Sequence, residues 1–329
     1  MLLCRILQSG FRRFHSTETA LVKVQSDILL SMDRQEITLL VLLDLSAAFD
    51  TIYHQILLNV LGNDSGIIGS SHKWLSSYLT GRNQRVLIND RTSDDFHLNC
   101  GVPQGSCMGP ILFISYTSRL YHVIANHLPS ADGYADDTQL YLSFRPNDRS
   151  SQDHAIASVE ACISDVCARL IFNYLLINDS KTEFLVIGSR HQLSKITIYS
   201  IKVVDSTIQP LKTRNLGSWF DCNMSMSIHI GKICSKAFYG LYKIRQIRKF
   251  LNVTSHLDYC NSILFGGPKY QIDRLQKVLN AAARLIFRIP KFDHISPALF
   301  HLHWLPVAYR VHFKLLLLVY KSLNNQGPQ

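Results

Sequence analysis

Hydrophobic and polar residues follow two different periods along the first part of the chain. Apolar residues recur every three or four positions over residues 17–32 and fill residues 37–43 without a break. The first pattern predicts a helix with one buried face, and the second, ITLLVLL, is typical of a strand buried on both faces. This strand ends at Asp44, and the apolar spacing becomes helical again from Ile52.

A second strand is indicated by the stretch YADDTQLYLSF, which covers residues 134–144. From residue 138 its apolar and polar side chains alternate, and this period of two predicts a strand with one buried face. Two carboxylates, Asp136 and Asp137, stand directly before the alternating residues. The preceding SADG should form a poor first arm of the hairpin, because aspartate and glycine disfavour strands.

Further segments complete a mixed pattern of helices and strands. The loop GVPQGSCMGP is rich in glycine and proline, and Pro110 suits the first turn of the apolar helix that follows it. Next come a helix over residues 153–170 and a turn followed by a strand over residues 176–188.

The last part of the chain is basic. Residues 201–329 contain 18 Lys and Arg against 5 Asp and Glu, a net charge of +13. The whole chain carries +10, so residues 1–200 carry −3. The basic part includes two amphipathic helices, predicted over residues 227–251 and 270–289, the second stopped by Pro290. This division suits a protein whose basic part binds nucleic acid and whose acidic part binds metal ions. The alternative is an ordinary basic surface exposed to solvent, which is common. We therefore predict two domains with a boundary at residue 200.

Length and composition exclude several classes of protein. At 329 residues and 47% hydrophobic, the chain should be globular. Its apolar runs are shorter than the roughly 18 residues that a membrane helix needs, so we expect no membrane span. The eight cysteines include no C-x-x-C pair, which argues against zinc and for a reducing compartment. We expect a protein that is not secreted. The acid-free N-terminus also suits a mitochondrial presequence, but a truncated reading frame explains it better.

Asp44 and Asp136 share an unusual setting, because each lies at the end or turn of an apolar strand. Burying an ionised carboxylate there without a partner would cost several kcal/mol. Two such carboxylates brought together would suit a pair of divalent metal ions about 4 Å apart, which promote phosphoryl transfer. The alternative is that each aspartate is a turn or helix-cap residue, and spacing alone does not decide between these readings.

Four segments in order point to a family. VLLDLSAAFDTIYHQILL, GVPQGSCMGPILF, YADDTQLYLSF and LINDSKTEFLVIG strongly resemble successive core motifs of the reverse transcriptases of LINE-type non-LTR retrotransposons. The likeness extends to QSGFRRFHSTETAL before them and RNLGSWFD after them, and it covers nearly the whole chain. It implies an α/β (α+β) fold: a polymerase palm with an antiparallel sheet backed by helices, then a mainly helical, basic thumb and connector. It also implies RNA-directed DNA synthesis from an RNA template, a DNA primer and dNTPs.

The resemblance assigns catalytic roles to individual residues. Asp44 and Asp136 would bind two Mg²⁺ (or Mn²⁺) ions, together with the backbone carbonyl of Leu45. Asp137 would lie near the primer terminus. Lys181 would protonate or neutralise the departing pyrophosphate, although a lysine in a polar turn is usually only solvated.

The resemblance also assigns residues that hold the nucleotide and the template. Phe49 matches the bulky side chain that excludes a ribose 2′-hydroxyl, and its alternative is an ordinary core aromatic. The loop with Gly101, Pro103, Gln104 and Gly105 would lie against the template base and the incoming nucleotide. Glycines let a backbone approach a ligand closely, and the glutamine amide both donates and accepts hydrogen bonds.

The hairpin RNLGSWFD resembles the element that grips the primer, with Asn215, Leu216 and Gly217 as the matching residues. The family has a fingers segment before QSGF with an arginine that clamps the triphosphate, but only MLLCRIL precedes it here, and neither Arg12 nor Arg13 matches that arginine. No endonuclease precedes these motifs and no Cys/His cluster follows them, so we expect at most the polymerase portion of an element. The resemblance implies a nuclear or cytoplasmic location for such a polymerase. The alternatives are an inactive remnant that binds RNA or RNA/DNA through its basic part, and a relic with no biochemical role.

Overall fold

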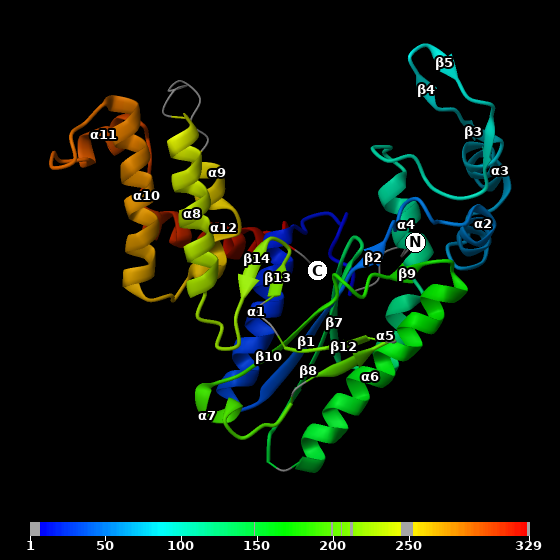
Figure 1. Cartoon of the computed structure of the whole chain (residues 1–329), viewed down its shortest axis with the longest axis horizontal. Coiled ribbons are helices and arrows are strands. Elements are labelled where there is room, and N and C mark those ends of the chain that lie inside the picture. Colours follow the sequence, from blue (N-terminus) through cyan, green and yellow to red (C-terminus); the bar gives the residue numbers. More distant parts are fainter. Residues whose placement is uncertain are drawn as a thin grey trace. The chain divides into compact units, whose positions relative to one another are not determined.

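The computed structural model describes residues 7–147, 149–198, 200–204, 206–210, 213–244 and 253–327. They form two compact units, whose elements are labelled in Figure 1. The first unit consists of the described parts of Met1–Arg12, Glu36–Val186 and Ser194–Pro210, and the second of those of Arg13–Gln35, Ile187–Leu193 and Leu211–Gln329. The chain therefore passes between the units several times. The expected boundary at residue 200 stays a prediction.

A four-stranded sheet lies at the centre of the first unit, with the strand order β10-β1-β8-β7. The strands are β1 (Ile37–Leu43), β7 (Ser130–Tyr134), β8 (Asp137–Phe144) and β10 (Glu183–Ile187). β1 and β8 are antiparallel along the whole of β1, from Ile37 opposite Phe144 to Leu43 opposite Thr138. Nearly every residue of β1 is buried, as its unbroken apolar run predicted.

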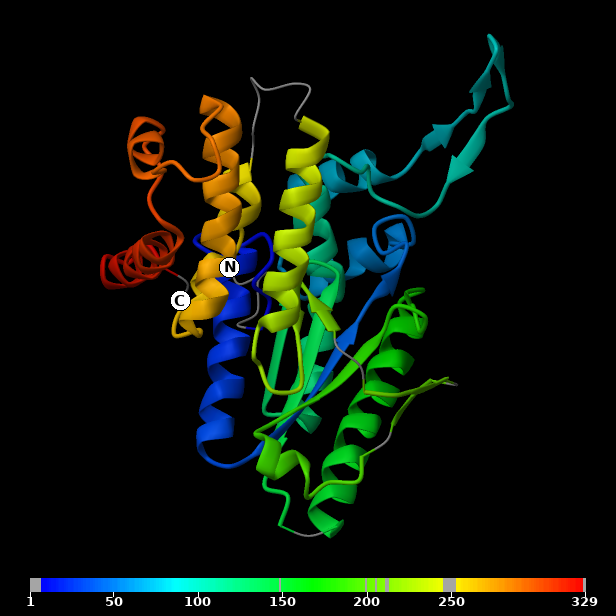
Figure 2. The same ribbon diagram turned by 60° about the vertical axis from the view of Figure 1, so that its left-hand side comes forward.

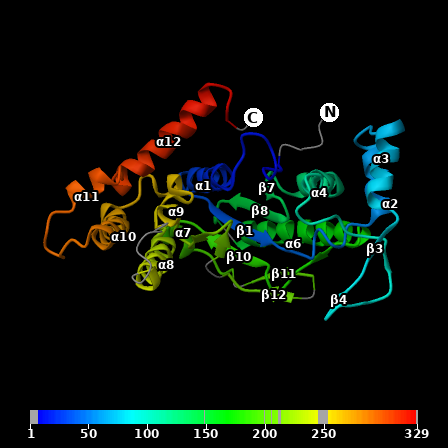
Figure 3. The same ribbon diagram turned by 90° about the horizontal axis from the view of Figure 1, so that it is seen from above.

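Helices pack on this sheet and on one another. The long helix α6 packs on β8 and on α5, and Figure 3 shows it running along the sheet. α4 packs on α2, and α2 packs on α3. Pro110 lies in the first turn of α4, as expected. The helices are α2 (His54–Asn63), α3 (Gly69–Leu79), α4 (Gly109–Thr117), α5 (Leu120–His127) and α6 (Arg149–Phe172).

The expectation of a weak first hairpin arm is wrong. Residues SADGY form β7, which pairs antiparallel with β8 along its whole length. Asp132 is fully buried, and its Oδ1 accepts a hydrogen bond of 2.9 Å from Ser9 Oγ. Glycine is required at position 133, because a Cβ on Gly133 would lie 1.7 Å from the hydroxyl oxygen of buried Tyr121. Tertiary contacts thus outweigh the low strand propensity of both residues.

A long hairpin extends between α3 and α4, with its tip away from the sheet of the same unit (Figures 1 and 2). Arg85 and Asp95 form an ion pair across it. Its strands are β3 (Arg82–Gln84), paired with β6 (Phe96–Leu98), and β4 (Leu87–Ile88), paired with β5 (Arg91–Thr92). Two other short pairs complete the unit: β2 (Leu45–Ser46) with β9 (Leu176–Ile177), and β11 (Ile201–Val203) with β12 (Ser206–Ile208).

The second unit is mainly helical. α8 packs on α10, while α1 and α12 both pack on the 3₁₀ helix η1. The expected helix over residues 17–32 and the two basic helices are confirmed, and the end of the first basic helix lies outside the described residues. In the part of the chain that the structure describes, no helix is long and apolar enough to cross a bilayer. The elements are α1 (Thr17–Asp33), α7 (Arg190–Leu193), β13 (Thr213–Asn215), β14 (Ser218–Phe220), α8 (Ser227–Ile244), α9 (Val253–Asp258), η1 (Asn261–Leu264), α10 (Lys269–Phe287), α11 (Ser296–His301) and α12 (Val307–Leu323).

A buried carboxylate joins three of these elements. Glu18 of α1 is 6% exposed, and its Oε1 accepts hydrogen bonds from Ser262 Oγ at 2.6 Å and from the Ser262 amide at 3.2 Å. Lys314 of α12 places its Nζ 3.0 Å from the other carboxylate oxygen. Both oxygens are therefore compensated, which makes burial of this charge tolerable.

Replacing Gly133 by alanine should destabilise the first unit. The new Cβ would meet the hydroxyl and ring of Tyr121, and overpacking of this kind costs about 1–3 kcal/mol in the free energy of unfolding. Urea unfolding followed by circular dichroism measures this change. The control is Gly62→Ala in α2, whose Cβ would lie 3.6 Å from His72 Nε2 and should leave stability unchanged or slightly higher. Equal stability of the two variants would contradict this packing argument.

Candidate active site

The register of the central sheet brings the expected acids together. Leu43 pairs with Thr138. Asp44 therefore follows β1 at the end of the sheet where Asp136 and Asp137 lie. Burial of its carboxyl group raises the pKa of Asp137 to about 6, and the negative charges of the nearby Asp136 and Asp44 contribute to this rise. The rise in this pKa is large even though Asp137 is an exposed residue.

Lys181 lies beside Asp44. Its Nζ is 3.5 Å from Asp44 Oδ2, and its positive charge opposes the rise in the pKa of Asp137. The turn that carries the lysine is fixed by its backbone, because the Asn178 amide donates a hydrogen bond of 2.8 Å to the Asp44 carbonyl. The lysine side chain is 68% exposed, so this single ion pair adds little stability.

One carboxylate oxygen of Asp44 lacks a hydrogen-bond donor. The Asp44 side chain is 26% exposed, but Oδ2 itself is buried and accepts no hydrogen bond. Leu45, whose carbonyl is the other expected metal contact on this segment, begins β2 opposite Ile177. Among the described residues, no three His, Cys, Asp or Glu side chains are already grouped as a metal site. A buried oxygen without a donor is nevertheless a position that suits a cation.

The glycine-rich loop docks on the turn that follows β1. The Gly101 amide donates a hydrogen bond of 2.8 Å to the Ile52 carbonyl. Gly101 has a φ of +85°, and a Cβ there would lie 3.0 Å from the Asp50 carbonyl oxygen, so a side chain would be strained. Gln104 Nε2 donates to both carboxylate oxygens of Asp50, at 3.0 and 3.3 Å. The same loop contains Pro103 and Gly105, the latter with a φ of +81°.

Phe49 supports this loop from the side of the turn. Its ring stacks on Phe113 of α4, with ring centroids 4.8 Å apart, and the side chain is half-buried. Its carbonyl accepts a hydrogen bond of 3.0 Å from the Val102 amide. This packing agrees with the core-aromatic reading and leaves part of the residue exposed, so the role in sugar selection stays a prediction.

Two residues that hold the loop had no signal in the sequence. His54 is buried at the start of α2, and its Nε2 donates to the Gly101 carbonyl at 2.8 Å. Arg82 Nη1 donates to the same carbonyl at 3.3 Å. The histidine lies 47 residues from its partner in the chain, and no local pattern reports a contact of that length.

The residues expected to grip the primer form a tight hairpin in the second unit. Asn215 of β13 pairs with Ser218 of β14, and Leu216 and Gly217 make the turn with φ angles of +42° and +87°. Two successive positive φ angles are typical of two-residue hairpin turns. Tyr259 Oη donates a hydrogen bond of 2.8 Å to the Leu216 carbonyl, which fixes the turn. Contact of this hairpin with a primer stays a prediction.

Exposed cations lie on the two packed helices of the second unit. α10 buries an apolar face that includes Leu275 and Val278, so its polar face is left to solvent. α8 also exposes three aromatic side chains, Phe238, Tyr239 and Tyr242. The exposed cations on α8 and α10 are Lys232, Lys236, Lys269, Arg274 and Lys277. This combination of charge and aromatic rings suits a nucleic-acid backbone.

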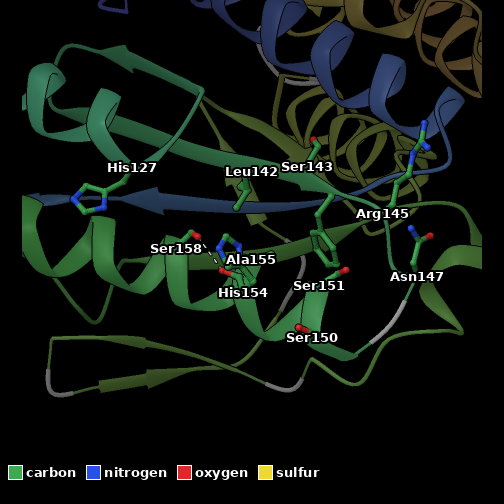
Figure 4. A pocket seen from close by; sticks show the side chains of 11 residues that line it. His127, Leu142, Ser143, Arg145, Asn147, Ser150, Ser151, His154, Ala155 and Ser158 are labelled. Carbon is green, nitrogen blue, oxygen red and sulfur yellow. Dashed lines mark hydrogen bonds between the residues drawn. The ribbon is translucent and has the colours of Figure 1, made fainter.

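A cavity in the first unit lies away from the acids. It has a volume of 570 Å³ and is enclosed by the end of β8 and the start of α6, as Figure 4 shows. Leu142, Arg145 and His154 line it, and Ser158 Oγ donates a hydrogen bond of 2.9 Å to the His154 carbonyl. Because this is the opposite end of β8 from Asp137, none of the expected site residues contributes to its wall.

An antiparallel sheet with acids at the end of a central strand and at the adjacent hairpin turn is the arrangement of a polymerase palm. The family model described as reverse transcriptase (RNA-dependent DNA polymerase) matches residues 4–220, more than half of the chain. The chain therefore belongs to the reverse transcriptase family. The resemblance and the α/β fold class are confirmed, while the roles of the single site residues stay predictions.

Curated relatives come from mobile elements. The probable RNA-directed DNA polymerase from transposon BS of Drosophila melanogaster is 25% identical over 318 residues, covering 87% of this chain and 33% of that protein. The corresponding protein from transposon X-element of the same organism is 26% identical over 304 residues, covering 85% and 31%. The chain thus spans about a third of the length of these relatives.

Solved structures similar to this chain include telomerase from Candida albicans in complex with the TWJ fragment of telomeric RNA. The TM-score is 0.43 and the sequence identity 13%, and the match covers 91% of this chain and 55% of that chain.

Acid should destabilise the second unit through His229. This residue is 3% exposed, its Nδ1 accepts a hydrogen bond of 3.3 Å from the Trp219 amide, and burial lowers its pKa from 6.5 to about 4. Between these values the unfolded chain binds more protons than the folded chain. The free energy of unfolding is therefore unaffected above about pH 6.5 and falls as the pH drops toward 4, by at most about 1.4 kcal/mol per pH unit.

Urea unfolding at pH 7 and pH 5 tests this effect, with His229→Asn as the matched variant. Asparagine does not titrate and keeps an oxygen acceptor for the Trp219 amide. The unchanged protein should lose about 1–2 kcal/mol more than the variant between the two pH values. Equal losses would show that His229 does not cause the acid sensitivity.

Proposed function

We propose that this chain catalyses RNA-templated DNA synthesis, transferring nucleotides from dNTPs to the 3′-hydroxyl of a DNA primer. The observation that carries the proposal is the meeting of Asp44 with Asp136 and Asp137 at one end of the sheet, with Lys181 beside them. Membership of the reverse transcriptase family supports the same reaction, as do relatives named RNA-directed DNA polymerases.

Two Mg²⁺ or Mn²⁺ ions suit the residues at this site. Among the described residues, none donates a hydrogen bond to the buried Asp44 Oδ2. The raised pKa of Asp137 reflects first the burial of its carboxyl group and then the negative charges of Asp136 and Asp44, which Lys181 opposes. Asp44, Asp136 and the Leu45 carbonyl would supply the oxygen ligands that Mg²⁺ prefers. The bound ions would activate the attacking hydroxyl and stabilise the charge on the transferred phosphoryl group.

The remaining residues would hold the substrates and move a proton. Lys181 is exposed and reaches the acids, so its ammonium group is placed to neutralise or protonate the leaving pyrophosphate. Gln104 and the glycines of its loop would lie against the template base and the nucleotide, since this loop is anchored on the turn after β1. Phe49, half-buried on that turn, would exclude a 2′-hydroxyl.

Primer extension on an RNA template with Mg²⁺ or Mn²⁺ tests the reaction. Asp136→Asn should lower the rate of dNTP incorporation at least about a hundredfold, because losing one ligand charge removes several kcal/mol of transition-state stabilisation. The control is Asp153→Asn, an exposed acid on α6, which should keep the full rate. Background incorporation by the unchanged protein, equal to that of Asp136→Asn, would refute the proposal.

The exposed cations of α8 and α10 favour a second function, nucleic-acid binding, which requires no catalysis. We infer that these helices bind an RNA/DNA duplex through its phosphates, which is also what an inactive remnant would keep. Such binding is independent of sequence and weakens steeply with salt, because each neutralised phosphate releases counterions.

The salt dependence of binding to a mixed-sequence RNA/DNA duplex tests this inference. Removing two charges with Arg274→Gln and Lys277→Gln should weaken binding at low salt. It should also reduce the slope of the logarithm of affinity against the logarithm of salt concentration by about 1 per removed charge. Lys195→Gln, an exposed cation of the first unit, is the control and should leave the slope unchanged. An undetectable complex at low salt, or an unchanged slope, would exclude this binding surface.

A further inference from the structure

The turn that carries the acids is bonded to a distant side chain. Gln8 is fully buried, and its amide faces the backbone of Ala135, the first residue of the turn between β7 and β8. Gln8 Nε2 donates a hydrogen bond of 3.1 Å to the Ala135 carbonyl, and Gln8 Oε1 accepts one of 3.2 Å from the Ala135 amide. The glutamine therefore holds both polar backbone groups of one turn residue.

The segment around Gln8 is itself tied to β7. Gln8 forms a parallel bridge with Gly133. The Ser9 amide donates to the Gly133 carbonyl at 2.6 Å, and the Gly133 amide donates to the Leu7 carbonyl at 2.7 Å. Gly10 approaches the turn so closely that a Cβ would lie 2.3 Å from the Ala135 amide nitrogen, and its own amide donates to Gln8 Oε1 at 2.8 Å. The glutamine amide is thus presented to the turn in one fixed orientation.

The turn needs such support because its conformation is unfavourable. Ala135 has a φ of +60°, in the left-handed region that costs a residue with a Cβ about 1–2 kcal/mol. The next two residues are Asp136 and Asp137, which repel each other and Asp44. Strain and charge repulsion both favour a different turn, and the hydrogen bonds to Ala135 oppose that change.

We propose that Gln8 is a positioning residue for the acids, acting through the backbone of Ala135 rather than by contact with substrate. This inference deepens the proposed function and rests on it. A displaced turn would move Asp136 away from the end of β1, where Asp44 lies. The loss should therefore appear in kcat, since positioning of reacting groups within tenths of an ångström governs the chemical step.

Gln8→Met is the test variant, since methionine has nearly the same shape without the amide. The matched control is Gln152→Met in the same unit. Gln152 is also buried, and its amide also bonds to a loop backbone: Nε2 donates to the Lys195 carbonyl at 3.3 Å, and Oε1 accepts from the Thr197 amide at 3.2 Å. Both variants lose the same kind of hydrogen bond, but only the first lies at the turn with the acids.

Two measurements separate positioning from a merely structural role. Gln8→Met should lower kcat for primer extension by tenfold or more with KM for dNTP within twofold, and Gln152→Met should change neither. Hydrogen exchange of the Ala135 amide, which needs no activity, should become at least tenfold faster in Gln8→Met and stay unchanged in Gln152→Met. An equal loss of kcat in the two variants, or unchanged exchange in Gln8→Met, would overturn the proposal.

The exchange measurement also keeps the two proposals distinguishable. If the unchanged protein extends no primer, the proposed function fails, while protection of the Ala135 amide still reports whether Gln8 holds the turn. If Gln8→Met does not fold, hydrogen exchange of the wild-type protein tests the proposal. Both the Ala135 and the Gly10 amide donate to Gln8 Oε1. If they exchange as fast as the amides of an unstructured peptide, Gln8 does not hold the turn.

Discussion

The antiparallel pairing of β1 with β8 is the constraint on which the candidate active site depends. It places Asp44, which follows Leu43, at the same end of the sheet as Asp136 and Asp137, which precede Thr138. These two acids are 92 and 93 residues from Asp44 in the chain. A slip of one residue would turn every side chain of a strand to the opposite face. Because β1 is buried on both faces and β8 packs on α6, such a slip would expose apolar surface and is strongly opposed.

Two carboxylates of this protein, the buried Glu18 and the partly exposed Asp44, differ in how far their charge is compensated. Glu18 has a hydrogen-bonding serine at one oxygen and a lysine at the other, and it joins three elements of the second unit. Among the described residues, none donates a hydrogen bond to the buried Oδ2 of Asp44, and the mostly exposed Lys181 places its Nζ 3.5 Å from this oxygen. Burial of charge is stable only when it is compensated. The incomplete compensation at Asp44 therefore fits a site whose remaining charge comes from bound ions.

Much of the framework could be predicted from local patterns, and the failures have physical causes. The unbroken run of β1 and the helical spacing in α6 and α10 each reflect burial of a face, and burial dominates the stability of long regular elements. The alternation in β8 predicted a strand correctly but its single buried face wrongly, because Gln139 and Tyr141 on the expected polar face are buried as well. SADG was misjudged because propensity describes an isolated strand. In the folded unit, Ser9 Oγ donates a hydrogen bond to Asp132 Oδ1, and Tyr121 occupies the space beside Gly133.

The sequence by itself determined the family, the segments that carry acids and the basic character of the last part, because motif order and charge are properties of the chain. Tertiary structure alone decided which residues hold those acids in place. Gln8 reaches the backbone of Ala135, 127 residues away, through two hydrogen bonds, and His54 reaches the carbonyl of Gly101, 47 residues away, through one. These hydrogen bonds leave no periodic trace in the sequence. Such contacts depend on the path of the whole chain, since they exist only after β1, β7 and β8 have paired.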